Sequence, residues 1–258
     1  MELFYRQLGQ GQPFIILHGL FGSSDNWLTQ AKLLSEHYHV FLIDQRNHGL
    51  SPHHDQLNYD VLADDLHAFI VQHHLTNPII LGHSMGGKAA MKFALRHPEL
   101  LQTLIVVDMA IRKYPVHHND IVEGLKTIPV DSLKSRNEAD EILSKHVPEP
   151  DVRQFLLKNL HRKPEGGFKW KINLPAIEKS LPNVGEETPT EKTFEKDALF
   201  IRGKKSNYVS DRDFDAIKVL FPKAEFITME TGHWVQAEKP QEFVEVILDY
   251  LKKIPLKN

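Results

Sequence analysis

The most informative absence in this sequence of 258 residues is cysteine, which does not occur at all. Without cysteine the chain can form no disulfide, no thiolate zinc site, no iron–sulfur cluster and no thiolate nucleophile. An excess of positive charge is missing as well, since 31 Lys and Arg stand against 34 Asp and Glu and give a formal net charge of -3. Proteins that bind nucleic acid through its phosphates carry a basic surface, so we expect no nucleic-acid partner.

Long apolar runs are also lacking, and no stretch approaches the ~18 apolar residues that a membrane-spanning helix requires. The first residues, Met1 to Arg6, lack the basic region and apolar run of a secretory signal. We therefore expect a cytoplasmic protein that does not bind a membrane.

Hydrophobic residues make up 41% and charged residues 25%, which is typical of one large folded domain, with or without an insertion. The sequence carries no signal for an oligomeric state.

Histidine, by contrast, is abundant, with 16 residues that include the adjacent pairs His53–His54, His73–His74 and His117–His118. Adjacent residues of a helix or strand point in different directions, so such a pair does not converge on one ion. The helical zinc motif H-E-x-x-H is absent from the sequence. We interpret the pairs as solvated surface and expect no metal ion and no other cofactor.

Short apolar runs bounded by turn residues alternate with amphipathic stretches at both ends of the chain. The runs that predict strands buried on both faces are 14–17, 40–43, 78–81, 104–107, 198–201 and 225–227. The stretches that predict helices are 59–74, 89–95, 211–220 and 241–252. This alternation is typical of an α/β fold with a mostly parallel, doubly wound sheet.

The alternation stops in the middle of the chain. Between residues 111 and 193 no strand-like run occurs, and short helices are predicted at 122–128, 139–146, 152–161 and 174–180. We therefore predict a core formed by residues 1–110 and 194–258, interrupted by a helical cap over 111–193. Insertions of this size lie over the carboxyl ends of parallel strands, where ligands bind in such folds.

Residues 82–86 read Gly-His-Ser-Met-Gly and fit the pattern G-x-S-x-G. The motif follows an apolar run and opens a helix of small residues, which is the context of a nucleophile elbow. In that turn the serine is strained, and only glycine lets the neighbouring backbone pack closely. A phosphate-binding loop would require Gly-Lys-Ser/Thr, whereas Gly87 and Lys88 are followed by Ala89. We interpret Ser84 as a nucleophile.

A serine nucleophile needs a base and a site for the oxyanion. His233 stands between Gly232 and an aromatic residue after the last predicted strand. In enzymes with a nucleophile elbow the catalytic residues follow one another along the chain as nucleophile, acid and histidine, and a histidine this late in the chain matches that order. Backbone N–H groups are fixed dipoles that can stabilise an oxyanion without reorganising. We predict that Met85 supplies one and Leu20, in the His-Gly-Leu-Phe-Gly segment at 18–22, supplies the other, with Phe21 as the alternative.

The elbow, the segment 18–22 and the segment 44–51 together resemble the α/β-hydrolase superfamily, over essentially the whole chain. The variant Arg-Asn-His-Gly at 46–49 and the insertion around 152–156 and 170–174 are most similar to the YbfF-type bacterial esterases. The resemblance implies a serine esterase with a helical cap. It also implies short to medium acyl esters or acyl-CoA thioesters as substrates.

The acid partner of the histidine departs from the common pattern. Many members of the superfamily have Asp in a Gly-x-x-Asp motif after the strand at 198–201, but here Ser206 stands at that position. A serine hydroxyl cannot stabilise an imidazolium as a carboxylate does. We predict Asp108, at the end of the strand 104–107, and the resemblance to the YbfF-type esterases favours the same residue. Asp211 remains the competitor, although Ser210-Asp211 is also typical of a helix start.

Two other functions use the same residues differently. A lyase that acts by proton abstraction can employ the same Ser-His-Asp triad on this fold. A non-catalytic ligand receptor would be expected to have lost the serine or the histidine, and both are present. In the insertion, Phe155, Phe168 and Trp170 either line an acyl pocket or pack the cap onto the core.

Overall fold

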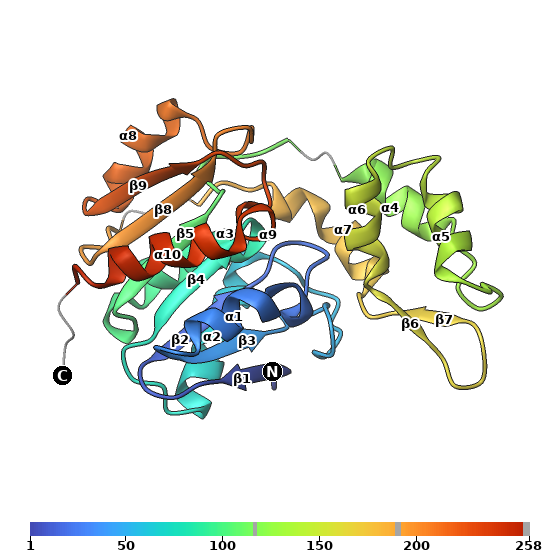
Figure 1. Cartoon of the computed structure of the whole chain (residues 1–258), viewed down its shortest axis with the longest axis horizontal. Helices are drawn as coiled ribbons and strands as arrows, with labels where there is room; N and C mark the ends of the chain where they lie inside the picture. Colours follow the sequence, from blue (N-terminus) through green and yellow to red (C-terminus); the bar gives the residue numbers. More distant parts are fainter. Residues whose placement is uncertain (116–117, 189–191, 255–258) are drawn as a thin grey trace.

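The computed structural model of the chain describes residues 1–115, 118–188 and 192–254. A seven-stranded sheet with the order β1-β3-β2-β4-β5-β8-β9 lies at its centre (Figure 1). The strands are β1 (Tyr5–Leu8), β2 (Pro13–Leu17), β3 (His39–Ile43), β4 (Ile79–His83), β5 (Thr103–Val107), β8 (Ala198–Gly203) and β9 (Ala224–Met229). All neighbouring pairs are parallel except β1 with β3, so the predicted mostly parallel α/β sheet is confirmed. The antiparallel edge strand β1 was not predicted.

Helices cover both faces of the sheet. The helices on one face are α1 (Leu28–Leu34), α9 (Val235–Glu238) and α10 (Pro240–Leu251). Those on the other are α2 (Tyr59–Gln72), α3 (Met85–Arg96) and α8 (Asp211–Leu220). Along β2, Phe14 and Ile16 pack into the first layer and Ile15 and Leu17 into the second. Because successive strand residues point to opposite faces, an uninterrupted apolar run is what a sheet buried on both sides requires. Among the described residues, none of the helices is both long enough and apolar enough to cross a bilayer.

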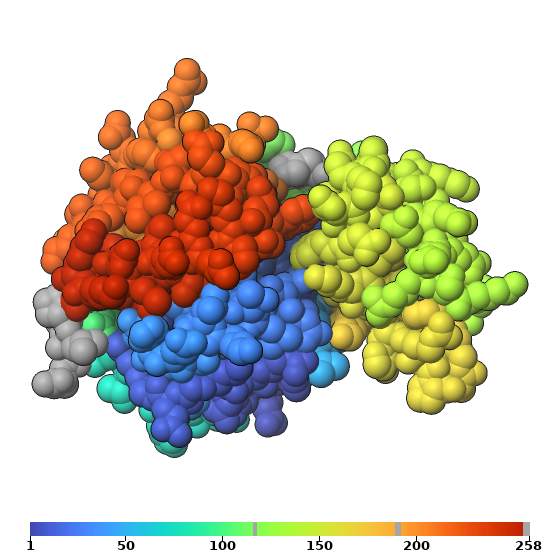
Figure 2. Space-filling model, in the orientation of Figure 1, coloured from blue at the N-terminus to red at the C-terminus, as the bar shows by residue number. Residues whose placement is uncertain are grey.

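Residues 118–184, between β5 and β8, form a lobe beside the core, drawn from yellow-green to golden orange at the right of Figures 1 and 2. Its elements are α4 (Asn119–Lys126), α5 (Arg136–Leu143), α6 (Pro150–Leu157), β6 (Leu160–Arg162), β7 (Phe168–Trp170) and α7 (Leu174–Val184). We propose that this lobe, residues 118–184, is the cap expected within 111–193, and we call it the cap lobe.

The hairpin β6–β7 corrects the expectation that this part of the chain has no strands. The helix predicted over 152–161 ends at Leu157, and β6 begins at Leu160. Of the six residues in its two strands, Leu160 and Phe168 are buried and the others are exposed or partly exposed. A three-residue strand with one buried side chain produces no apolar run, so the pattern that identifies the central strands is absent here.

The cap lobe joins the core through two chain segments, 111–115 and 185–188, which we call the neck. Their backbones are linked where the N–H of Tyr114 donates to the carbonyl of Gly185 at 2.7 Å. The amino group of Lys88, on α3, donates to a backbone carbonyl of each segment, at 2.7 Å on the first. Lys88 is fully buried, and burial lowers its pKa to about 7. The two segments of the neck are therefore hydrogen-bonded to each other and, through Lys88, to the core.

Candidate active site

Ser84 lies in a sharp turn between β4 and α3, with φ 54° and ψ -119°. A positive φ is strained for a residue with a side chain, and such strain concentrates at functional sites. A Cβ at Gly82 would lie 2.1 Å from the carbonyl oxygen of Gly86, and a Cβ at Gly86 would lie 2.4 Å from that of Leu17. The two glycines are therefore required because the helix start packs directly onto the strand ends.

Asp108 follows β5, the neighbour of β4, and its carboxylate is fully buried. Oδ2 lies 2.7 Å from Nδ1 of His233, and Oδ1 accepts a hydrogen bond from the N–H of Gly203 at 2.9 Å. The hydroxyl of Ser206 also donates to Oδ2. Three donors therefore converge on this one buried carboxylate. Ser206 thus contacts Asp108, the residue predicted as the acid.

Asp211, the competing candidate for the acid, lies elsewhere. It begins α8, its side chain is 83% exposed, and its carboxylate pairs with Arg202 at 2.6 Å. The structure brings Asp108, and not Asp211, into contact with the imidazole of His233.

His233 follows β9, and its ring is held by two other rings. It stacks on Tyr208 with ring centroids 3.9 Å apart and an angle of 17°, and it lies 4.7 Å from the ring of His83. His83 Nε2 donates to the backbone carbonyl of His233 at 2.9 Å. Burial lowers the pKa of His83 to about 3, so this ring is neutral beside His233. Tyr208 was not predicted as a site residue, although it lies only two residues after Ser206.

The segment 18–22 is a tight loop at the end of β2. The carbonyl of Gly19 accepts hydrogen bonds from His18 Nδ1 at 2.8 Å and from the N–H of Gly22 at 2.9 Å. In a trans peptide the C=O and the N–H point in opposite directions, so the N–H of Leu20 is directed away from these two donors. Among the described residues it has no acceptor, and Leu20 lines the cavity that contains Ser84.

Phe21, the alternative oxyanion donor, already uses its N–H, which donates to Nε2 of His48 at 3.2 Å. This contact favours Leu20 over Phe21 as the free donor. The N–H of Met85 belongs to the first turn of α3, where backbone donors have no partner within the helix.

His18 and His48 both serve this loop as neutral rings. Nδ1 of His48 donates to the carbonyl of Arg46 at 2.9 Å while Nε2 accepts from Phe21. Nε2 of His18 accepts in the same way from the N–H of Gln45 at 3.0 Å. A protonated ring could not accept these bonds, and burial lowers the pKa of His18 to about 4 and that of His48 to about 3. Both rings therefore have a structural role, since each accepts and donates hydrogen bonds that hold the loop.

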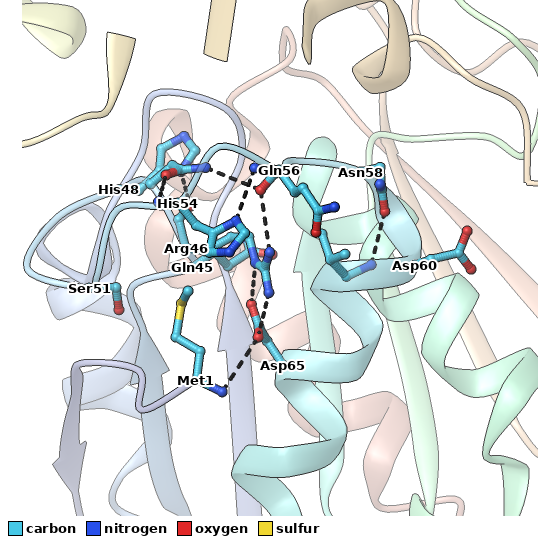
Figure 3. A network of polar contacts seen from close by, with 12 residues as sticks. Met1, Gln45, Arg46, His48, Ser51, His54, Gln56, Asn58, Asp60 and Asp65 are labelled. Carbon is cyan, nitrogen blue, oxygen red and sulfur yellow. Dashed lines mark hydrogen bonds and ion pairs between the residues drawn. The ribbon is translucent and has the colours of Figure 1, made fainter. Parts of the chain in front are cut away.

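A buried ion pair anchors the segment that carries His48 (Figure 3). The guanidinium of Arg46 binds both carboxylate oxygens of Asp65 on α2, at 2.5 and 2.8 Å, and donates to the carbonyl of Gln56 at 3.3 Å. The amino group of Met1 lies 3.9 Å from the same carboxylate. The bidentate geometry fixes the direction of the segment 44–51 relative to the sheet.

Ser84 and His233 line one cavity of about 720 Å³ between the core and the cap lobe. From the cap lobe, Val152, Phe155 and Leu156 contribute to its wall, and Phe155 packs against Trp234 with ring centroids 5.5 Å apart. Phe168 and Trp170 do not line this cavity and pack in the apolar core instead.

No group of three or more potential metal ligands occurs in the described ranges 1–115, 118–188 and 192–254. His117, one member of a histidine pair, lies outside them. His53 and His54 are both exposed, which agrees with the interpretation as solvated surface. The interpretation does not hold for His118, which lines the cavity that contains Ser84, or for His73, which packs against the rings of Tyr5 and Phe69.

The fold and the strained serine turn define an α/β hydrolase, and comparison with known proteins agrees. The family model for the alpha/beta hydrolase fold matches residues 12–135. A sn-1-specific diacylglycerol lipase, ABHD11, from Danio rerio is 37% identical over 253 residues, covering 95% of this chain and 80% of the relative. Esterase YbfF from Escherichia coli is 34% identical over 243 residues, covering 93% and 92%. The chain belongs to the α/β-hydrolase family.

Among solved structures, a marine microorganism esterase is 43% identical with a TM-score of 0.94 and covers 96% of this chain and 99% of its own. The resemblance to the YbfF-type esterases is thus confirmed, as is the expectation of an enzyme of the ester-hydrolase class.

Proposed function

We propose that this protein is a serine esterase that hydrolyses short to medium acyl esters through an acyl-enzyme on Ser84, with His233 as the base and Asp108 as the acid. The observation that carries the proposal is the 2.7 Å contact between Asp108 and His233 beside the cavity that also contains Ser84. Relatives named as esterases and a lipase, similar over nearly the whole chain, support the same reaction.

The proposed reaction has two steps. Asp108 binds Nδ1–H of His233, which leaves Nε2 free to accept the proton of Ser84 as its Oγ attacks the ester carbonyl. The N–H groups of Leu20 and Met85 then stabilise the oxyanion, each by about 3–4 kcal/mol. The imidazolium returns its proton to the departing alkoxide. Water, deprotonated by His233, finally hydrolyses the acyl-enzyme.

The two cavities beside Ser84 suggest where the parts of an ester bind. A second, much smaller cavity, which shares Leu20 and Ser84 with the first, is lined mainly by apolar and aromatic side chains, among them Met109, Tyr114 and Leu181. An acyl group of a few carbons fits such a space, whereas the larger cavity is open enough for the alcohol part. We therefore expect activity to fall as the acyl chain lengthens.

The charges around the larger cavity favour esters over acyl-CoA thioesters. Glu149, Asp151 and Glu238 line it, and among the described lining residues there is no Lys or Arg. Coenzyme A carries several phosphate charges, which carboxylates repel and no cation here would bind. We propose neutral carboxylic esters as the substrate class.

The test is a series of 4-nitrophenyl esters and acyl-CoA thioesters of matched chain length. We expect saturable turnover of the short esters, poor turnover of the thioesters, and a loss in kcat of at least about 10⁴ for Ser84→Ala. The matched control is Ser180→Ala, which changes a buried serine on α7 and should leave kcat unchanged.

Undiminished turnover by Ser84→Ala would exclude this nucleophile. Absence of ester turnover in the wild type, with Ser84 still labelled by a fluorophosphonate, would favour the lyase that uses the same triad. Tight ligand binding without any turnover would favour the receptor.

A further inference from the structure

Asn159 reaches from the cap lobe into the loop that holds Leu20. It lies between α6 and β6, and its side chain is nearly completely buried, with the residue 3% exposed. Its amide Nδ2 donates to the carbonyl of Phe21 at 2.8 Å and to that of Leu156 at 3.1 Å. The first contact joins residues 138 positions apart, one in the core and one in the cap lobe.

The carbonyl that Asn159 binds belongs to a strained residue. Phe21 has a φ of 60°, in the left-handed region that bulky side chains avoid. Such a conformation is strained and persists only where the surroundings fix it. Phe21 is 3% exposed, and a buried carbonyl without a donor would add a further penalty. His48 holds the N–H of Phe21, and Asn159 holds its C=O.

The hydrogen bonds that hold the backbone of the loop 18–22 come from both the core and the cap lobe. The carbonyl of Gly19 and the N–H of Phe21 are held by residues of the core, namely His18, Gly22 and His48. The carbonyl of Phe21, by contrast, is held by a side chain of the cap lobe, since it accepts the hydrogen bond from Asn159. The C=O of Phe21 and the N–H of Gly22 belong to one peptide, so Asn159 also fixes the N–H that Gly22 donates to the carbonyl of Gly19. The peptide of Gly19 carries the N–H of Leu20, whose orientation therefore depends in part on the contact from the cap lobe.

We propose that Asn159 is a positioning residue of the active site, which holds Phe21 in its left-handed conformation and thereby aims the N–H of Leu20 at the oxyanion. The inference rests on the proposed esterase function. It means that the cap lobe takes part in stabilising the transition state as well as in enclosing the substrate. A cap lobe that moves away withdraws the donor from Phe21 and relaxes the loop.

The experiment compares Asn159→Ala and Asn159→Leu, the second of which keeps the side-chain volume but removes the N–H donor. The matched control is Asn183→Ala, because the Asn183 amide of α7 also donates from the cap lobe to a core carbonyl, that of Leu57, at 3.1 Å and away from the loop. Each variant is assayed for kcat and KM on a short 4-nitrophenyl ester and for inhibition by an alkylboronic acid. The boronic acid forms a tetrahedral adduct with a serine and places an oxygen in the oxyanion position.

Misplacing a transition-state donor lowers kcat more than it weakens substrate binding. We expect both Asn159 variants to lose about 10- to 100-fold in kcat with KM changed less than about threefold. The inhibition constant of the boronic acid should rise by the same factor as kcat falls. The control Asn183→Ala should stay within about threefold in all three quantities.

If Asn159→Leu folds, as judged by its melting temperature, and keeps kcat and boronate affinity within threefold, the proposal is wrong. Equal losses in Asn159→Ala and Asn183→Ala would also overturn it, because they would show a general effect of lobe packing. Failure of the esterase proposal itself is distinguishable, since the wild type would then show neither ester turnover nor boronate inhibition.

Discussion

The substitution Asp108→Asn tests the proposed acid with little change in shape. Asparagine tolerates the left-handed backbone that residue 108 adopts, with a φ of 47°. The N–H of Gly203 points at Oδ1 and needs an acceptor, so the new amide should place its oxygen there. Its NH₂ group then occupies the position of Oδ2, facing Nδ1 of His233.

That orientation reverses the tautomer of the imidazole. The amide N–H donates to Nδ1, so the proton of the neutral ring moves to Nε2, which can no longer accept the proton of Ser84. The hydroxyl of Ser206 also loses its acceptor on Oδ2. We expect kcat to fall by about 10³–10⁴, which corresponds to about 4–5 kcal/mol of transition-state stabilisation.

The assay is steady-state hydrolysis of a short 4-nitrophenyl ester, with the folded state checked by thermal unfolding. The control is Asp211→Asn, which removes an exposed carboxylate paired with Arg202 and should change kcat less than twofold. A loss below tenfold in Asp108→Asn would refute the reasoning about the tautomer. A severe loss confined to Asp211→Asn would move the acid to that residue.

Two further predictions concern stability. Because burial holds the pKa values of His18, His48 and His83 at about 4, 3 and 3, below the ordinary 6.5, the unfolded chain binds protons that the folded chain does not as the pH falls below about 6.5. We expect the free energy of unfolding in urea to fall by several kcal/mol between pH 7 and pH 4.5, and unchanged or higher stability at pH 4.5 would contradict this. Asp65→Asn should cost about 3–5 kcal/mol, measured as a lower urea midpoint at unchanged slope, because it leaves the buried guanidinium of Arg46 without its carboxylate. A cost below about 1 kcal/mol would show that this pair does not support the fold.

The central sheet was predictable because its strands are buried on both faces and therefore read as uninterrupted apolar runs, as at 104–107. Elements with one buried face left no such signal. The edge strand β1 has no fully buried residue, and in the hairpin the buried Leu160 is followed by exposed residues. Local propensity cannot identify strands whose pairing depends on distant partners.

The candidate site likewise contains residues that a local sequence pattern predicts and residues that depend on distant contacts. Ser84 lies in a motif whose glycines and neighbours are contiguous in sequence, so the pattern alone indicates its turn. The contributions of Ser206, Tyr208 and Asn159 depend on contacts with residues 98, 25 and 138 positions away. The residues adjacent to them in sequence give no signal for these contacts. Ser206, at the position where the common pattern has Asp, indicated only that the predicted acid had to be another residue.

The structure of the neck determines how the cap lobe of such an enzyme could be replaced. Because its two segments are hydrogen-bonded to each other and to Lys88, the cap lobe leaves and rejoins the core at nearly one point. A different lobe could be spliced between the same two segments without shifting the strand ends that present Ser84 and Asp108. Such a graft would keep the chemistry and exchange the substrate, provided that the new lobe brought an amide donor for the carbonyl that Asn159 now binds.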